Sequence, residues 1–188
     1  MNKKGTLAIL IGPSGSGKGT LIHQLLQDDQ ETFLSVSATT RAPRPGETDK
    51  VNYYFITKEE FEQMIADNAL LEYACYCENY YGTPKAPVFE RLDRGEHVLL
   101  EIEMQGAKQV KAQYPDAVSI FIMPPSMEEL RRRLTGRGTE TAEVIEKRLA
   151  AAVGEMEYAK ECDRVVVNDD VVRAAREIAE ILDNCTKA

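Results

Sequence analysis

The stretch of sequence from residue 12 to residue 18 reads Gly12-Pro13-Ser14-Gly15-Ser16-Gly17-Lys18 and matches the pattern G-x-x-x-x-G-K. The short apolar run Thr6 to Ile11 precedes it and predicts a fully buried strand. After Lys18, apolar side chains recur with helical spacing from Leu21 to Leu26. A strand, a glycine-rich turn and a helix in this order are the context that a phosphate-binding loop requires. The stretch therefore predicts an α/β fold with a nucleotide phosphate site at the turn.

The residue types in this loop suit a polyphosphate. Glycines let the backbone curl so that successive N–H groups point at an anion, and the helix N-terminus adds partial positive charge. Lys18 supplies a mobile cation for the β and γ phosphates. Gly19 stands where Ser or Thr normally offers a hydroxyl to Mg²⁺, and Thr20 follows one residue later. We expect Mg²⁺ to be held mainly by phosphate oxygens and water, with Thr20 contacting a phosphate. The alternative is a glycine-rich turn whose lysine is merely exposed. It is disfavoured because the strand, loop, lysine and helix follow one another in the order that the motif requires.

The rest of the chain repeats the rhythm of strand and helix. Four further apolar runs predict buried strands: Phe33–Ser37, His97–Glu103, Val118–Met123 and Arg164–Asn168. Two long helical patterns cover Thr141–Lys160 and Val171–Leu182. Five buried strands that alternate with helices predict a parallel sheet with helices on both faces, which is a three-layer α/β core.

Residues 38–94 break this rhythm and predict a small α+β insertion between the second and third core strands. Two runs there, Tyr53–Ile56 and Leu70–Tyr76, read as strands. Thr57 and Glu60 form a capping box that starts a helix. We expect one domain, with a core of residues 1–37, 95–125 and 151–188 and a helical lid at residues 126–150.

Composition narrows the class of protein. The chain has 188 residues and a formal net charge of −8, which argues against a general nucleic-acid binder. No apolar run approaches the length of about 20 residues that spans a membrane. The first residues show no secretory signal, so we expect a cytoplasmic location. The sequence leaves open whether the chain is a monomer or a homo-oligomer. We expect free thiols, and neither a zinc site nor a disulfide, from Cys75, Cys77, Cys162 and Cys185.

The run Ser37-Ala38-Thr39-Thr40-Arg41-Ala42-Pro43-Arg44-Pro45-Gly46-Glu47 resembles the signature of guanylate kinases, which are P-loop nucleoside-monophosphate kinases. The resemblance extends in order from about residue 5 to residue 182. It includes Glu72, residues 79–83, 104–106, 124–126, 136–138 and 167–170. It implies transfer of a phosphoryl group from MgATP to GMP, and also to dGMP.

The resemblance assigns the acceptor phosphate to a cationic loop. Arg41 and Arg44 would clamp the GMP phosphate and hold it in line for the reaction, joined by the hydroxyls of Tyr53 and Tyr81. Guanidinium groups match phosphate oxygens bidentately, and charge-assisted hydrogen bonds are the strong ones. Without the resemblance, two solvated loop charges would be the alternative for Arg41 and Arg44.

The resemblance assigns Glu72 to the guanine base. Guanine presents two adjacent donors, N1–H and the 2-amino group, to which a carboxylate offers two acceptor oxygens. Adenine would leave the buried carboxylate unpaired, which disfavours it. Ser37 and Thr83 would meet O6 and N7 with their hydroxyls. On the residue alone, Glu72 would read as an ordinary strand residue.

Glu101 and Glu103 lie at the end of a predicted strand, where the family usually has aspartates. Glu101 is expected near the acceptor base, or ordering water bound to Mg²⁺. The equally favoured alternative is a strand-end acid that pairs with Arg41 or Lys18.

The predicted lid is rich in arginine. The resemblance assigns Arg137 and Arg148 to the transferring phosphates, and Asn168 to the adenine of ATP. Arg131, Arg132 and Arg133 read as a solvated helix face, and the alternative for Arg133 is a contact with ATP. Phosphoryl transfer needs mostly positioning and charge neutralisation, so Lys18 and the arginines would carry the catalysis.

The sequence leaves two rival functions. One is a kinase of the same class with AMP or UMP as acceptor, against which Glu72, Ser37 and residues 80–83 speak. The other is a non-enzymatic binding module of the kind found in scaffold proteins, where the phosphate loop has decayed. The intact loop with Lys18 and the lid arginines favour an enzyme.

Overall fold

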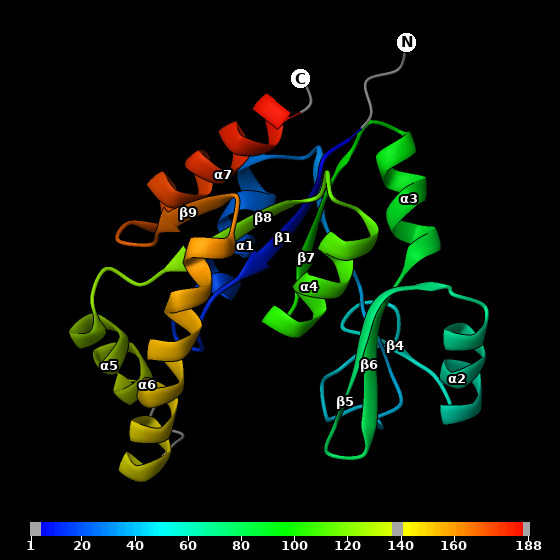
Figure 1. Ribbon diagram of the computed structural model, residues 1–188, viewed down its shortest axis with the longest axis horizontal. Coiled ribbons are helices and arrows are strands. Elements are labelled where there is room, and N and C mark those ends of the chain that lie inside the picture. The colour runs from blue at the N-terminus through cyan, green and yellow to red at the C-terminus, as the bar shows by residue number, and fades with distance from the viewer. Residues whose placement is uncertain (1–4, 137–140, 186–188) are drawn as a thin grey trace.

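The computed structural model describes residues 5–136 and 141–185. Its main sheet has five strands in the order β2-β7-β1-β8-β9, and every pairing between neighbours is parallel. The strands are β1 (Leu7–Ile11), β2 (Thr32–Leu34), β7 (His97–Glu101), β8 (Val118–Met123) and β9 (Arg164–Val167). Parallel strands need crossover connections, and helices supply most of these here. The five-stranded parallel sheet expected from the sequence is confirmed (Figure 1).

Helices cover both faces of this sheet because its central strand is apolar throughout. Successive side chains of β1 point to opposite faces, so Ile9 and Leu10 belong to different hydrophobic clusters. Helices α1 (Lys18–Asp28) and α7 (Val171–Cys185) complete the cluster of Leu10. The cluster of Ile9 includes α3 (Lys85–Asp93), α4 (Met104–Gln113) and the 3-10 turn η1 (Tyr158–Glu161). The predicted three-layer core is therefore confirmed.

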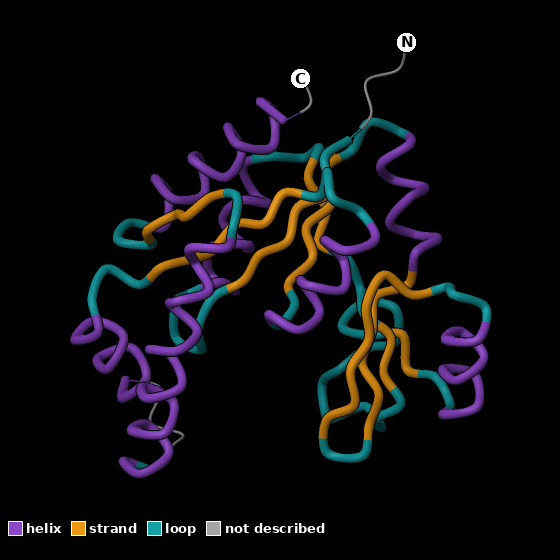
Figure 2. The backbone as a smooth tube through the Cα atoms, in the orientation of Figure 1, coloured by secondary structure: helices purple, strands orange, loops and turns teal. Residues whose placement is uncertain are grey.

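Between β2 and β7 the chain builds a second, smaller sheet. Its order is β4-β3-β6-β5, with one parallel pair, β3–β4, and two antiparallel pairs. The strands are β3 (Ala38–Thr39), β4 (Tyr54–Phe55), β5 (Leu70–Tyr76) and β6 (Asn79–Pro84). Helix α2 (Lys58–Ala66) packs on it through Phe61, and the capping box of Thr57 and Glu60 is present. Figure 2 shows this sheet apart from the main one.

Two further helices extend from the other side of the main sheet (Figure 1). They are α5 (Met127–Gly136) and α6 (Ala142–Glu157), which pack against each other through Leu130, Leu134, Ile145 and Leu149. The three-part division into core, insertion and lid stays a prediction.

Some elements differ from their predicted bounds. The predicted strands Leu70–Tyr76 and Val118–Met123 have those bounds in the structure, whereas β2 begins before the predicted Phe33 and ends at Leu34. β7 stops at Glu101 because Glu103 is the N-cap of α4, a helix that was not predicted. Strands β3 and β6 were not predicted either. β3 has only two residues, and β6 contains Gly82 and Pro84, which weaken a strand pattern.

Candidate active site

The loop between β1 and α1 turns at glycines with positive φ angles. Gly17, the N-cap of α1, has φ +89°, a left-handed conformation that favours glycine. A Cβ at Gly17 would lie 2.5 Å from Asn168 Nδ2, and one at Gly12 would lie 2.5 Å from the carbonyl oxygen of Ile122. Both positions therefore require glycine, because backbone and side chains of the core approach closely there.

Three cations hold this loop from different elements. Lys18 Nζ donates to the carbonyl oxygens of Gly12 at 2.5 Å and Pro13 at 3.3 Å. Arg148 of α6 donates to Ser14 Oγ at 2.5 Å. Arg133 of α5 donates to the carbonyl oxygens of Ser16, at 3.1 Å, and of residue 168, at 2.9 Å. The predicted donor residues Lys18 and Arg148 thus meet at the loop.

Asn168 lies directly after β9 and is buried against the same loop. Its Nδ2 donates to the carbonyl oxygen of Ser16 at 2.8 Å. Within residues 5–136 and 141–185, Asn168 Oδ1 and Ser16 Oγ are buried side-chain atoms with no hydrogen-bond partner. An unpaired buried acceptor is costly, so both atoms suit a bound ligand.

The arginines of α5 do not behave alike. Arg131 and Arg132 form exposed ion pairs, with Glu146 and Glu129 respectively, as a solvated helix face predicts. Arg133 is half-buried and binds both Glu129 and the loop. The guanidinium groups of Arg132 and Arg133 lower the pKa of Glu129 to about 2. The backbone N–H of Glu129 donates to the hydroxyl oxygen of Ser126 at 3.0 Å, which caps the start of α5. The expected phosphate ligand Arg137 lies outside the described residues.

Arg41, in the loop after β3, pairs with a carboxylate and lies against two aromatic rings. Its NH1 and NH2 donate to the two carboxylate oxygens of Glu47 at 3.0 and 2.9 Å. Its guanidinium lies 5.6 Å from the ring centre of Tyr53 and 5.8 Å from that of Phe55. The hydrogen bonds with Glu47 raise the pKa of Arg41 and lower the pKa of Glu47. Arg41 is therefore a fixed cation, whereas Arg44 is exposed.

The other predicted phosphate ligands lie beside Arg41. The rings of Tyr53 and Tyr81 meet edge to face at 6.1 Å. A hydrogen bond with Tyr81 also raises the pKa of Arg41. Ser37 is half-buried, and its carbonyl oxygen accepts the backbone N–H of Tyr54 at 2.9 Å. These residues come from separate segments that the small sheet joins.

Glu72 is a buried acid at the junction of β5, β6 and α4. It is 7 % exposed, and its Oε1 accepts the hydroxyl of the fully buried Thr83 at 2.7 Å. Burial raises the pKa of Glu72, and the hydrogen bond from Thr83 partly opposes that rise. A Cβ at Gly106 would lie 2.7 Å from Oε2, so only glycine leaves the carboxylate in place. Two of the residues predicted to read a base, Glu72 and Thr83, are therefore in direct contact.

An acid that the sequence did not single out lies near Lys18. Burial raises the pKa of Glu155 in α6, the charge of Glu103 raises it further, and Lys18 lowers it. No motif marks Glu155, since it falls on a helical pattern rich in alanine and glutamate. Glu101, the last residue of β7, is exposed. The described part of the chain contains no group of three or more His, Cys, Asp or Glu side chains that could hold a metal ion.

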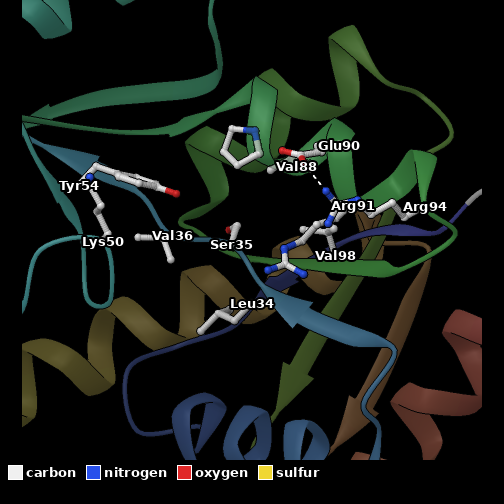
Figure 3. A pocket seen from close by; sticks show the side chains of 11 residues that line it. Leu34, Ser35, Val36, Lys50, Tyr54, Val88, Glu90, Arg91, Arg94 and Val98 are labelled. Atoms are coloured by element: carbon white, nitrogen blue, oxygen red, sulfur yellow. Dashed lines mark hydrogen bonds and ion pairs between the residues drawn. The ribbon is translucent and has the colours of Figure 1, made fainter.

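Figure 3 shows a cavity of about 300 Å³ in another place, between the end of β2, β4 and α3. Ser35, Tyr54 and Arg91 are among the residues that line it. The guanidinium of Arg91 stacks 3.7 Å from the ring centre of Phe33 and pairs with Glu96 at 3.0 Å. None of the predicted site residues lines this cavity, so it is distinct from the candidate site.

Comparisons with known proteins agree on one family. The family model described as guanylate kinase matches residues 4–185. A guanylate kinase of Clostridioides difficile is 53 % identical over 182 residues, which are 97 % of this chain and 89 % of that protein. One of Synechocystis sp. is 52 % identical over 179 residues, which are 95 % and 94 %. The crystal structure of guanylate kinase from Anaplasma phagocytophilum is 36 % identical with a TM-score of 0.74 and covers 97 % of this chain and 86 % of that one. No helix among the described residues is long and apolar enough to cross a membrane.

Proposed function

Because the chain belongs to the guanylate kinase family, we propose that it transfers the γ-phosphoryl group of MgATP reversibly to GMP, and also to dGMP. The full-length match to relatives of this name supports the proposal. Action on free nucleotides in the cytoplasm, as part of purine metabolism, belongs to the same proposal.

The loop of residues 12–20 would hold the ATP phosphates. In the structure the ammonium of Lys18 binds the loop's own carbonyl oxygens, and phosphate oxygens would replace these as acceptors. Arg148 donates to Ser14 Oγ at the same loop. From there its guanidinium would stabilise the negative charge that develops on the phosphoryl group during transfer. The unpaired Oδ1 of Asn168 offers an acceptor for the 6-amino group of adenine.

Arg41 and Arg44 would hold the GMP phosphate, with the hydroxyls of Tyr53 and Tyr81. Arg41 is fixed beside both rings. The attacking atom is an oxygen of the GMP phosphate, so the reaction needs no nucleophilic side chain. Holding two anions close together in line is the main task of such a site.

Guanine would replace the hydroxyl of Thr83 on Glu72. A hydroxyl has one proton, which Glu72 accepts in this structure at 2.7 Å. When guanine N1–H and the 2-amino group donate to the carboxylate, the hydroxyl of Thr83 can donate to guanine instead. The hydroxyl of Ser37 would also donate to guanine. Glu101 would lie near the base. The exchange favours guanine because adenine offers no pair of donors to satisfy Glu72.

The residues fit a magnesium ion that arrives on the nucleotide. The described chain has no cluster of metal-ligating side chains at the loop, and Thr20 is an exposed hydroxyl in the first turn of α1. The ion would be held through phosphate oxygens and water, and it supplies charge neutralisation on the phosphates when bound.

We assign residues 38–94 to GMP binding and residues 126–150 to a lid that contributes Arg137 and Arg148. Movement of α5 and α6 over the loop would exclude water and suppress hydrolysis of ATP. The helices already contact the loop through Arg133 and Arg148.

The observation that carries the proposal is the buried pair of Glu72 and Thr83 in a chain that also has an intact phosphate loop. The test is ADP formation, measured in a coupled assay with GMP, AMP, CMP or UMP as acceptor. We expect a clear preference for GMP. A preference for any other base, or no ATP consumption with GMP and Mg²⁺, contradicts the proposal.

A further inference from the structure

Glu47 occupies the centre of the loop that would hold the GMP phosphate, although no role for it follows from the proposed function. Its carboxylate accepts Arg41 NH1 and NH2 at 3.0 and 2.9 Å. It also accepts the backbone N–H of Arg44 at 2.7 Å. The side chains of Arg41 and Glu47 are only 15 % and 19 % exposed. This ion pair is therefore bidentate and better shielded from water than the bidentate pairs of Arg131 and Arg132, whose side chains are 53 % and 76 % exposed.

The loop backbone fixes the carboxylate where it lies. The N–H of Glu47 donates to the carbonyl oxygen of Arg44 at 3.0 Å and closes a turn. Pro43 and Pro45 restrict the backbone on both sides of Arg44, and Gly46 has φ +88°. The position of Glu47 is a property of this turn, so it does not depend on whether an anion is bound to Arg41.

Arg41 keeps donors for a second anion. A guanidinium has five N–H groups. Glu47 accepts two of them, the carbonyl oxygen of Ala42 accepts a third at 2.7 Å, and Tyr81 makes a further hydrogen bond with Arg41. An incoming phosphate can bind the donor that remains and replace Tyr81, while Glu47 stays in place. An arginine that is already ordered loses less side-chain freedom on binding than a mobile one.

We propose that Glu47 is a positioning residue, which holds the Arg41 guanidinium and the Arg44 backbone in the arrangement that receives the GMP phosphate. The inference rests on the proposed function. The alternative is that Glu47 is an internal anion that competes with the phosphate and must leave. The two roles predict opposite changes in GMP affinity when Glu47 is replaced. Loss of a positioning residue weakens GMP binding, whereas loss of a competing anion strengthens it.

The test compares Glu47→Gln with Glu59→Gln, which removes the same charge from an exposed position in α2. Glu47→Gln keeps the size of the side chain but presents a donor to Arg41. We expect its KM for GMP to rise about tenfold, because the interaction energy between two charged side chains in hydrogen-bond contact corresponds to a change of about that size in affinity. The values of kcat and of KM for ATP should stay within about twofold, as should all constants of Glu59→Gln.

A second readout separates positioning from a general structural effect. Guanosine has no phosphate, so its inhibition constant should be the same in Glu47→Gln and in the unmodified protein. In an Arg41→Met background, Glu47→Gln should add no further rise in KM for GMP, because the guanidinium is gone and the amide oxygen of the new side chain can still accept the Arg44 N–H. Glu47→Asp keeps the charge with a shorter reach and should give an intermediate KM; it also serves if Glu47→Gln does not fold.

Three results would overturn the inference. They are an unchanged or lower KM for GMP in Glu47→Gln, an equal loss of guanosine binding, and additive effects with Arg41→Met. If the unmodified protein does not phosphorylate GMP, the proposed function fails. If it does and Glu47→Gln behaves like Glu59→Gln, only the role of Glu47 fails.

Discussion

The proposed donor and acceptor halves of the candidate site are built in different ways. The donor half is a continuous loop whose backbone, at residues 12–18, is shaped by glycines at the end of β1. The acceptor half consists of side chains from separate segments, which the small sheet and α4 bring together. A backbone cradle is specified locally, whereas the acceptor half depends on tertiary packing.

The halves also differ in how their cations are held. Lys18 and Arg133 both donate to carbonyl oxygens of the loop backbone, and Arg133 also pairs with Glu129. Arg41 pairs with a carboxylate of its own loop and lies against aromatic rings. The cations of the proposed donor half are thus held on loop backbone, and those of the proposed acceptor half by side chains. The variants below test this distinction.

The largest effect is expected from Lys18→Ala. The variant removes the cation of the donor half and leaves the small sheet intact. We expect kcat to fall by about 10²–10³ or more, the usual loss for one preorganised donor at a developing charge. Steady-state kinetics with GMP and MgATP measure it.

The binding of GMP to Lys18→Ala is the control. Calorimetry with GMP alone should give nearly the affinity of the unmodified protein, because the acceptor half does not include Lys18. A comparable loss of GMP affinity would mean that the two halves are not separate and that the subsites are misassigned.

Glu72→Gln is expected to have the next largest effect, on the acceptor half. The amide presents one acceptor and one donor to guanine, so a buried donor of the base or of the side chain is left unpaired. We expect kcat/KM for GMP to fall about 100-fold, with ATP binding unchanged. Equal kinetics for both proteins would remove Glu72 from base recognition.

The pH dependence of GMP use follows from the same residue. Burial raises the pKa of Glu72 above its ordinary value of 4.5. As the pH falls through this raised pKa, the carboxyl takes a proton and loses an acceptor for guanine, so KM for GMP should rise. The rise should begin at a pH above 4.5 and should be absent in Glu72→Gln, which has no proton to gain.

The same contrast explains what the sequence could predict. The strand Val118–Met123 and the glycine-rich turn between β1 and α1 are local patterns, and the structure has both where the sequence predicts them. Helix α4 was missed because it begins at Met104 with only a few apolar positions around Gly106. The contact between Glu72 and Thr83 joins two strands across a sheet whose strand β6 was not predicted. The roles of both residues came from family resemblance and not from spacing.

Contacts that cross between elements left no local signal. Arg133 was expected on the same solvated helix face as Arg131 and Arg132, apart from a reach toward ATP, and it alone of the three contacts the loop. The bidentate pair of Arg41 and Glu47 could not be foreseen either, since it depends on a turn that closes within residues 44–47. Such contacts depend on the direction in which each side chain points, which residue type does not determine.

Gly106→Ala should sharpen the comparison through packing alone. The new methyl group would lie 2.7 Å from Glu72 Oε2, so the carboxylate must move. We expect KM for GMP to rise about tenfold, because the displaced carboxylate loses one good hydrogen bond with the base. KM for ATP should stay unchanged. Gly154→Ala in α6 is the matched control, because nothing lies within 4 Å of its added Cβ. Alanine there should stabilise the helix by up to about 1 kcal/mol. Equal GMP kinetics in the two variants would show that Glu72 tolerates displacement.

The smallest effect is expected from Arg133→Ala, paired with Arg131→Ala on the same helix. Arg133 is 24 % exposed and bridges α5 to the carbonyl oxygens of Ser16 and Asn168, so its loss should loosen the donor loop. We expect KM for ATP to rise roughly fivefold, which corresponds to a net loss of about 1 kcal/mol in hydrogen bonding. Arg131→Ala removes an exposed ion pair with Glu146, and such pairs contribute about 0–1 kcal/mol. Its KM for ATP should therefore stay unchanged. If both variants bind ATP equally well, the loop of the donor half holds its shape through its own backbone. The donor half would then depend even less on side chains from other elements than the acceptor half does.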